Sequence, residues 1–405
     1  MKTHLISLTM QIKIYALFIL LLMRFLPASI AQPYSIGHTT INFQDSVRSR
    51  SVQTELYYPA DLNGENVSVT QQTTEAFPVL VFGHGFVMSW DAYQNLWEAL
   101  VPQGYVMAFP VTETGFSPSH DELGKDLAFL ANRIKEEGND VLSLFYQRVD
   151  SAVCVMGHSM GGGASFLAAS QSSAFTAIVN LSAAETNPSA IAAASTISLP
   201  ALLFAGENDC VTPPATNQQL MYDALASTCK TLVTIHGGSH CQMAESNVFC
   251  NLGESSCSPA PAISRAEQHD IINRFILPWL DFYLKGNCQS GSAFDSLVNA
   301  DTAVTVQSNC QLCISAATME ISRTQKLSFF PNPVSENLLI DWRNESSDAY
   351  VQVEVFDVYG RMILDQKVPS GPILQVSFRG LTAGIYQVRA KDEHSSYSGT
   401  VLHFN

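Results

Sequence analysis

Charged side chains are scarce in this chain of 405 residues. They make up 14% of it, and the formal net charge is −15. No run of basic residues is present. Such a composition disfavours binding to the phosphate backbone of nucleic acids or to anionic membranes. We therefore expect no nucleic-acid partner.

Metal and nucleotide signatures are also lacking. No histidine stands at the spacing from cysteines or carboxylates that zinc sites use. The glycines at 161–163 are not followed by the Lys-Ser/Thr pair of a phosphate loop. The sequence therefore predicts neither a metal nor a cofactor.

The apolar run near the N-terminus, residues 14–22, is shorter than the ~20 residues that a membrane span needs. Arg24 and Pro27 follow this run, and small residues stand at positions 29 and 31, which a signal peptidase reads. The pattern is typical of a secretory signal peptide, which we expect over residues 1–31 with cleavage after Ala31.

The motif GHSMG occupies residues 157–161, between an apolar run at 152–156 and a segment at 162–171 that can be helical. This placement is typical of a nucleophile elbow, where a serine sits on a strained strand-to-helix turn between small residues. The alternative is a glycine-rich turn that only reverses the chain. The motif favours Ser159 as the nucleophile of a serine hydrolase.

A serine nucleophile needs a histidine base and a carboxylate, which in α/β-hydrolases follow it in the order Ser, Asp, His. Asp209 and His240 meet this order, and each stands in a turn after an apolar run. Glu207 and Asp223 are the alternative carboxylates, but Asp223 falls within a helical pattern and Glu207 lies closer to the strand. We predict the triad Ser159, Asp209 and His240.

An oxyanion hole requires two backbone N–H groups aimed at the developing negative charge. The turn at 83–86 follows an apolar run at 77–82, where hydrolases supply one donor, and the residue after the nucleophile supplies the other. The alternative for this turn is a tight loop that needs glycine for its backbone angles. We predict the N–H groups of Phe86 and Met160.

Nine cysteines fit an exported protein that forms disulfides. Cys154 lies in a predicted strand and is expected to be a buried free thiol. We predict a Cys210–Cys241 bridge, because both cysteines directly follow a predicted triad residue. The nearly equal alternative pairs Cys210 with Cys229. Cys250 and Cys257 could close a short loop by pairing with each other. Three further cysteines cluster after the last predicted helix, namely Cys288, Cys310 and Cys313.

Apolar runs and helical periodicity predict an alternation of strands and helices. We expect strands near 78–82, 105–110, 152–156, 177–181, 201–205 and 230–235. We expect helices near 91–101, 121–137, 161–171, 214–227 and 264–285. An antiparallel edge hairpin is expected over 39–59, and an insert rich in Ser, Cys, Gly and Pro over 242–262. This is the pattern of an α/β-hydrolase fold with a mostly parallel central sheet.

After Cys313 the pattern of apolar and polar residues changes. A polar linker at 315–326 precedes short alternating runs at 338–342, 351–358 and 376–378, which predict a small all-β, Ig-like sandwich. We expect the hydrolase domain over 32–314 and the sandwich over 327–405.

Three motifs in this region, FPNPV (330–334), VFDVYGR (355–361) and LTAGIY (381–386), resemble the C-terminal sorting domain of the type IX secretion system of Bacteroidetes. The resemblance implies a secreted or cell-surface protein whose partner is the type IX machinery. The alternative is a carbohydrate-binding sandwich.

The motifs GHSMGGG (157–163), GEND (206–209) and GSH (238–240), with the turn that ends at Phe86, resemble the dienelactone hydrolase-like and polyester hydrolase (cutinase-type) branch of α/β-hydrolases. The resemblance implies that Phe86 and Met160 also pack on the acyl group. Polyester hydrolases carry a tryptophan after the strand at 177–181, and residues 181–188 contain none.

In the absence of that tryptophan, Glu185 or Thr186 is expected to face the substrate, and His158 is expected to line the cleft. The predicted function is cofactor-free hydrolysis of a small or polymeric ester by a monomer. Two alternatives stay open, hydrolysis of a peptide amide or thioester and a non-catalytic surface binding protein. The lack of an acidic pair for a peptide amine disfavours an aminopeptidase, and the complete triad disfavours a binding protein.

Overall fold

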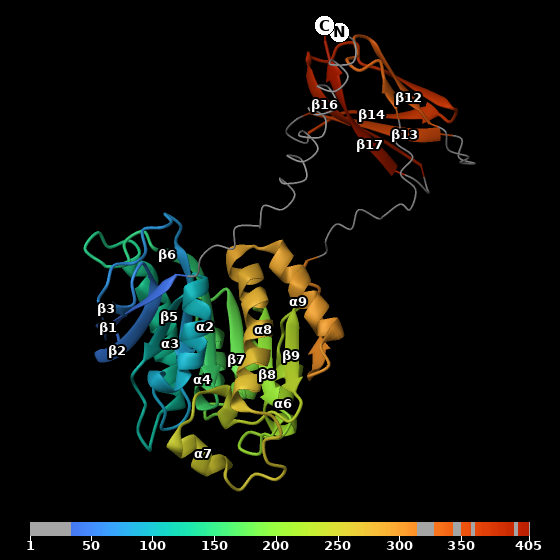
Figure 1. The fold of residues 1–405 in the computed structure, drawn as a ribbon. Helices are drawn as coiled ribbons and strands as arrows, with labels where there is room; N and C mark the ends of the chain where they lie inside the picture. Colours follow the sequence, from blue (N-terminus) through green and yellow to red (C-terminus); the bar gives the residue numbers. More distant parts are fainter. Residues whose placement is uncertain (1–33, 314–327, 343–349, 358–360, 393–395, 405) are drawn as a thin grey trace, which may run out of the picture. The chain divides into compact units, whose positions relative to one another are not determined.

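A computed structural model describes residues 34–313, 328–342, 350–357, 361–392 and 396–404 of the protein (Figure 1). The chain divides into two compact units, which meet in sequence between Ile314 and Ser315. The predicted signal peptide and linker lie outside the described residues.

The first unit is built on a ten-stranded sheet with the order β10-β9-β8-β7-β6-β4-β5-β2-β1-β3. Its strands are β1 (Ser35–Asp45), β2 (Arg50–Ala60), β3 (Gly64–Glu65), β4 (Phe77–Gly83), β5 (Val106–Pro110), β6 (Val149–His158), β7 (Ala177–Leu181), β8 (Ala201–Gly206), β9 (Lys230–Ile235) and β10 (Val304–Ser308). The six central strands, β5, β4, β6, β7, β8 and β9 in sheet order, pair in parallel. Next to them, β2 pairs antiparallel with β5, and β10 pairs antiparallel with β9. The predicted α/β-hydrolase fold with a mostly parallel sheet is confirmed.

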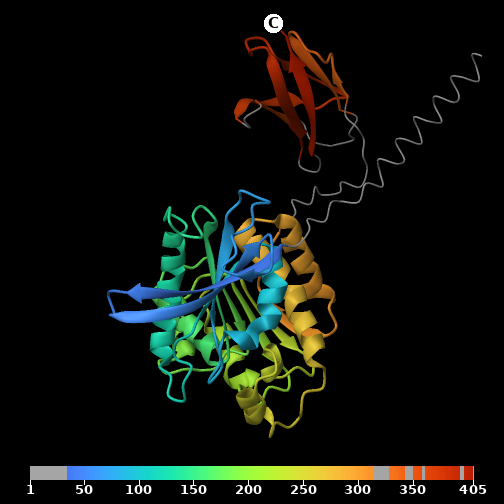
Figure 2. The same cartoon turned by 60° about the vertical axis from the view of Figure 1, so that its left-hand side comes forward.

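Helices cover both faces of this sheet (Figures 1 and 2). The helical segments are η1 (Trp90–Tyr93), α2 (Gln94–Leu100), η2 (Val101–Gln103), α3 (His120–Glu137), α4 (Met160–Gln171), α5 (Ala190–Ala194), η3 (Pro214–Thr216), α6 (Gln218–Ala224), η4 (Cys241–Met243), α7 (Val248–Glu254), α8 (Arg265–Lys285) and α9 (Cys288–Ala300). Alternate residues of the central strands serve two cores: Val153 and Val155 of β6 pack under α3 and α4, while Met156 packs on the side of α8. Because both faces are covered, these strands are apolar throughout.

The elements α9 and β10 are absent from the sequence prediction. The helix α9 carries a weakly apolar face, and β10 is a short strand in which only Val304 is buried. Both elements bury few side chains, so the sequence has no continuous apolar run at these positions.

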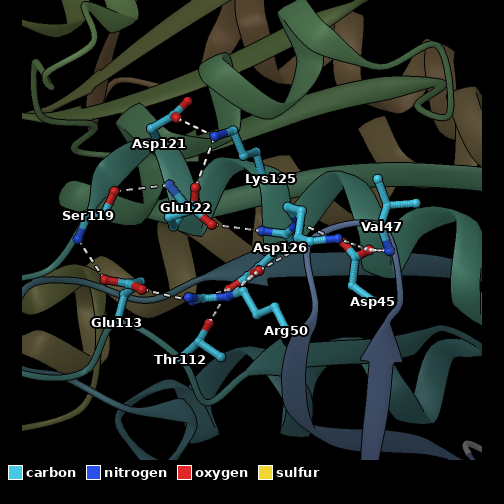
Figure 3. A network of polar contacts seen from close by, with 11 residues as sticks. Asp45, Val47, Arg50, Thr112, Glu113, Ser119, Asp121, Glu122, Lys125 and Asp126 are labelled. Carbon is cyan, nitrogen blue, oxygen red and sulfur yellow. Dashed lines mark hydrogen bonds and ion pairs between the residues drawn. The ribbon is translucent and has the colours of Figure 1, made fainter.

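The β1–β2 hairpin is fixed to α3 by a network of polar contacts (Figure 3). The carboxylate of Asp126 is fully buried and accepts from the guanidinium groups of Arg48 and Arg50, at 2.7 and 2.8 Å. The hydroxyl of Thr112 donates to the same carboxylate at 2.6 Å. Two charged donors and a hydroxyl thus compensate the desolvation of this carboxylate.

The second unit consists of two antiparallel sheets, with orders β11-β12-β15 and β14-β13-β16-β17. The strands are β11 (Phe329–Phe330), β12 (Asn337–Asp341), β13 (Tyr350–Phe356), β14 (Met362–Pro369), β15 (Ile373–Ser377), β16 (Gly384–Lys391) and β17 (Ser396–His403). Both sheets contribute to one buried core that contains Trp342 and Phe378. This agrees with the predicted all-β domain, although β11, β14, β16 and β17 have no counterpart in the prediction.

Among the residues that the structure describes, no helix is both long and apolar enough to cross a membrane.

Candidate active site

Ser159 stands between β6 and α4 in a conformation that few non-glycine residues adopt, with φ 54° and ψ −121°. The glycines around it permit a close backbone approach. A Cβ atom on Gly83 would lie 2.9 Å from the carbonyl oxygen of Gly161, and one on Gly157 would overlap the backbone of Gly161. The loop after β4 can therefore pack directly against the first turn of α4, as the nucleophile elbow requires.

The structure brings together the three residues of the predicted triad. The Oγ atom of Ser159 lies 2.9 Å from Nε2 of His240, and Nδ1 of His240 lies 2.8 Å from Oδ2 of Asp209. All three side chains are buried. They come from the carboxyl ends of β6, β8 and β9, which parallel pairing aligns along one edge of the sheet.

Thr212 supports the Asp209 carboxylate and was missed by sequence reasoning. Its backbone N–H donates to Oδ1 of Asp209 at 2.7 Å, and its hydroxyl donates to Oδ2 at 2.9 Å. The spacing Asp-x-x-Thr, which is typical of a side-chain-capped turn, is the signal that could have found it. The alternative carboxylates are used elsewhere, because Glu207 accepts from the N–H of Gly237 and Asp223 contacts Gln219.

The two predicted oxyanion donors lie in the turn after β4 and at the start of α4. Met160 opens α4, where helix N–H groups have no intrahelical acceptor and the helix dipole favours negative charge. Within the described residues, the N–H of Phe86 donates no hydrogen bond. The turn that carries Phe86 is held by His84, whose Nε2 atom lies 2.7 Å from the carbonyl oxygen of Thr112.

His158 does not line a cleft, and this part of the sequence prediction is wrong. Its side chain is fully buried: Nδ1 lies 3.1 Å from the hydroxyl of Tyr93, and Nε2 lies 3.2 Å from the carbonyl oxygen of His240. The Tyr93 hydroxyl in turn accepts from the N–H of Gly85 at 2.7 Å. Burial holds the pKa of His158 well below its ordinary value, so the ring is neutral and, through Tyr93, links the turn at 83–86 to the His240 loop.

The segment after β7 is used differently from the expectation. Thr186 is buried and its hydroxyl donates to the carbonyl oxygen of Pro188, so it does not face a substrate. Glu185 is exposed, but its carboxylate accepts from the N–H of Ile191 at the start of α5. A segment without a strand or helix pattern leaves the direction of its side chains undetermined in the sequence, and this is why the Thr186 prediction failed.

Comparison with known proteins adds to this geometry. Residues 32–258 match the family described as PET hydrolase-like. The chain belongs to the PET hydrolase-like family. Residues 328–402 match the family described as secretion system C-terminal sorting domain, which confirms the predicted type IX sorting domain. A domain of this kind marks a protein for secretion or for the cell surface.

Three relatives of this PET hydrolase-like chain are informative. Cutinase cut1 of Thermobifida fusca is 25% identical over 220 residues, which are 53% of this chain and 66% of that protein. Cutinase 1 of Thermobifida cellulosilytica is 25% identical over 187 residues, 46% of this chain and 64% of that protein. The AB hydrolase superfamily protein YfhM of Bacillus subtilis is 31% identical over 108 residues, 27% of this chain and 36% of that protein. The chain thus spans just under two thirds, or less, of the length of these relatives.

The disulfides of this PET hydrolase-like chain differ from the predicted pairing. The Cys210–Cys241 bridge, its alternative Cys210–Cys229 and the Cys250–Cys257 loop are all wrong. The bridges are Cys210–Cys257, Cys229–Cys310, Cys241–Cys250 and Cys288–Cys313, and Cys154 is a buried free thiol as predicted.

The physical reason for the new pairing is the fold of the insert at 242–262. It forms η4 and α7 beside the triad loops and supplies one cysteine to each of them, with Cα separations of 5.4 Å for Cys210–Cys257 and 5.7 Å for Cys241–Cys250. The carboxylate of Glu254 accepts from the N–H of Cys241 at 3.0 Å. The insert is therefore anchored to the loops that carry Asp209 and His240.

No group of three or more His, Cys, Asp or Glu side chains placed to hold a metal ion occurs in the part of the chain that the structure describes.

Proposed function

We propose that this protein is an exported serine hydrolase that cleaves carboxylic esters through an acyl-enzyme. The proposal is carried by one observation, the chain of short contacts from Ser159 through His240 to Asp209, at 2.9 and 2.8 Å. Membership of the PET hydrolase-like family and the likeness to proteins named cutinases support an ester as substrate.

In the first step, His240 acts as the base. Its Nδ1–H donates to Asp209, and this fixes the tautomer in which Nε2 accepts the hydroxyl proton of Ser159. The Oγ atom of Ser159 then bonds to the ester carbonyl carbon. The carbonyl oxygen becomes an anion, which the N–H groups of Phe86 and Met160 stabilise.

In the second step, Nε2 of His240 returns the proton to the alcohol oxygen as its bond to the carbonyl carbon breaks. A water molecule repeats the sequence on the acyl-enzyme, releases the acid and restores Ser159. The mechanism uses side chains and backbone groups only and requires no cofactor. Asp209 stays ionised and stabilises the imidazolium that forms in each step.

The test is hydrolysis of p-nitrophenyl acetate by the full chain. Ser159→Ala should abolish activity with an unchanged melting temperature, and Asp209→Asn should lower kcat by about 10⁴-fold through the wrong tautomer. Glu207→Gln is the matched control, because the Glu207 carboxylate accepts from the N–H of Gly237 and belongs to the same loop as Asp209. Activity of Ser159→Ala within tenfold of wild type would overturn the proposal. Greater loss in Glu207→Gln than in Asp209→Asn would reassign the carboxylate.

A further inference from the structure

Three phenylalanine rings form a continuous row on the surface beside the candidate active site. The ring centroids of Phe86 and Phe116 are 6.4 Å apart, and those of Phe116 and Phe249 are 5.7 Å apart. Both pairs meet edge to face, the geometry that aromatic rings prefer. The rings are nevertheless open to solvent, with 48%, 71% and 50% of their surface exposed. We call these residues the aromatic row.

The row is assembled from three separate parts of the chain. Phe86 lies in the turn after β4, Phe116 in the connection between β5 and α3, and Phe249 in α7. Leu252 stands three residues after Phe249, on the same side of α7, and is 70% exposed. A contiguous exposed apolar surface is uncommon on a soluble protein and marks a place where something apolar binds.

The far end of the row is held in position. Asn247 caps α7 by accepting from the N–H groups of Phe249 and Cys250, at 3.0 and 3.2 Å. Cys250 is bonded to Cys241, the residue after His240. The backbone of Phe249 is thus tied through one disulfide to the loop of the proposed base. A preformed surface loses little conformational freedom on binding, and this favours affinity.

The near end of the row is Phe86, which also carries one of the two proposed oxyanion donors. The backbone N–H of Phe86 is the proposed oxyanion donor, so a substrate bound there has its carbonyl at the first ring. The spacing of the rings exceeds the reach of an acetyl group, and only a longer chain can contact all three. The net charge of −15 disfavours an anionic membrane surface as the occupant.

We propose that the aromatic row binds the extended apolar acyl chain of the ester substrate and makes long-chain esters the preferred class. The inference rests on the proposed function, because it uses Ser159 as the point of attack. The row lies on the turn after β4, the β5–α3 connection and α7, and not on the segment after β7 that lacks the tryptophan of polyester hydrolases.

The experiment compares kcat/KM for p-nitrophenyl acetate and p-nitrophenyl decanoate in the full chain. Phe249→Ala and Phe116→Ala should each lower the decanoate value by about tenfold, from the lost apolar contact, and leave the acetate value unchanged. Phe249→Leu should retain most of the decanoate activity. The matched control is Leu142→Ala, since Leu142 is 91% exposed and precedes β6, at the sheet edge opposite Ser159.

A second measurement separates this inference from the proposed function. Binding of p-nitrophenyl decanoate to Ser159→Ala needs no turnover, and Phe249→Ala in that background should weaken it by about tenfold. If the wild type hydrolyses neither ester but decanoate binding still depends on Phe249, the aromatic row is supported as a binding site and the proposed function is overturned. Equal effects on acetate and decanoate, or no effect on decanoate kinetics or binding, would overturn the inference.

Discussion

Thr212 shows how a residue outside the triad can set its geometry. The hydroxyl of Thr212 lies 2.9 Å from Oδ2 of Asp209 and 3.0 Å from Nδ1 of His240, and it accepts from Nε2 of Gln218 at 3.1 Å. The Asp209 carboxylate is therefore held in place by the Thr212 side chain, which Gln218 of α6 holds in turn.

We predict that Thr212→Val lowers kcat for p-nitrophenyl acetate by about tenfold or more, because a hydrogen bond to a charged group contributes about 1.5–3 kcal/mol. The backbone N–H of Thr212 still donates to Asp209 in this variant, so activity should not fall as far as in Asp209→Asn. Thr212→Ser, which keeps the hydroxyl, serves as the control. Equal kinetics for the valine and serine variants would contradict the prediction.

His158 makes the stability of the first unit depend on pH. Burial lowers its pKa well below 6.5 in the native state, whereas in the unfolded chain the ring titrates at its ordinary value. Above that value both states are neutral and His158 contributes no pH dependence. As the pH falls through 6.5, the unfolded state binds a proton that the native state does not, and the free energy of unfolding decreases.

We predict that His158→Gln has a flatter stability profile between pH 7 and pH 5 than the wild type. Glutamine does not titrate and can still donate to the carbonyl oxygen of His240. One proton corresponds to a slope of about 1.4 kcal/mol per pH unit, which the variant should lack. Denaturant unfolding of the wild type and the variant across this pH range measures the slope. Parallel profiles of the free energy of unfolding against pH would contradict the neutral, buried state of His158.

At the scale of elements, α7 is a short helix that disulfides hold in place. The Cys210–Cys257 bridge closes a separation of 47 residues, and the Cys241–Cys250 bridge closes one of 9. Cross-linking restricts the unfolded chain more when the closed loop is longer. The two bridges should therefore differ in their contribution to stability while anchoring the same helix.

We predict that the paired substitution of Cys210 and Cys257 by alanine lowers the free energy of unfolding by about 4 kcal/mol, against about 2.6 kcal/mol for Cys241 and Cys250. Calorimetry of the full chain, following the transition of the first unit, measures both. If removing the Cys241–Cys250 bridge lowers the free energy of unfolding more, native contacts of α7 contribute more to that free energy than loop closure does.

On the scale of the whole molecule, the two units match two different protein families. The second unit has its own core, in which Trp342 and residues from both sheets are buried. The residues Ser159, Asp209 and His240 all belong to the first unit. The sorting family matches the second unit, and the PET hydrolase-like family matches the first.

We predict that a chain ending at Ser315 keeps its ester hydrolysis and its melting transition within error, because every proposed catalytic group lies before Ile314. The same truncation should abolish export from a host with the type IX machinery, and full-length protein should be exported. Fractionation of the culture measures this, and normal export of the shortened chain would refute the sorting role.

The sequence by itself determined the features that arise from local pattern. The apolar runs of the central strands stand out because parallel strands are buried on both faces. The elbow at 157–161 needs small residues at fixed positions. Ser159, Asp209 and His240 each follow an apolar run, and parallel strands bring such turns to one edge of the sheet. These signals are contained within a few residues, so they could be read without a structure.

The tertiary structure alone decided what depends on segments far apart in the chain. The partners of Cys210 and Cys241 follow from the fold of the insert, which has no periodic pattern to predict it. His158 is buried because Tyr93 and the His240 loop pack against it, and the aromatic row exists because two loops and the helix α7 converge. Contacts of this kind depend on how distant segments pack and how loops close. A short stretch of sequence does not carry that information.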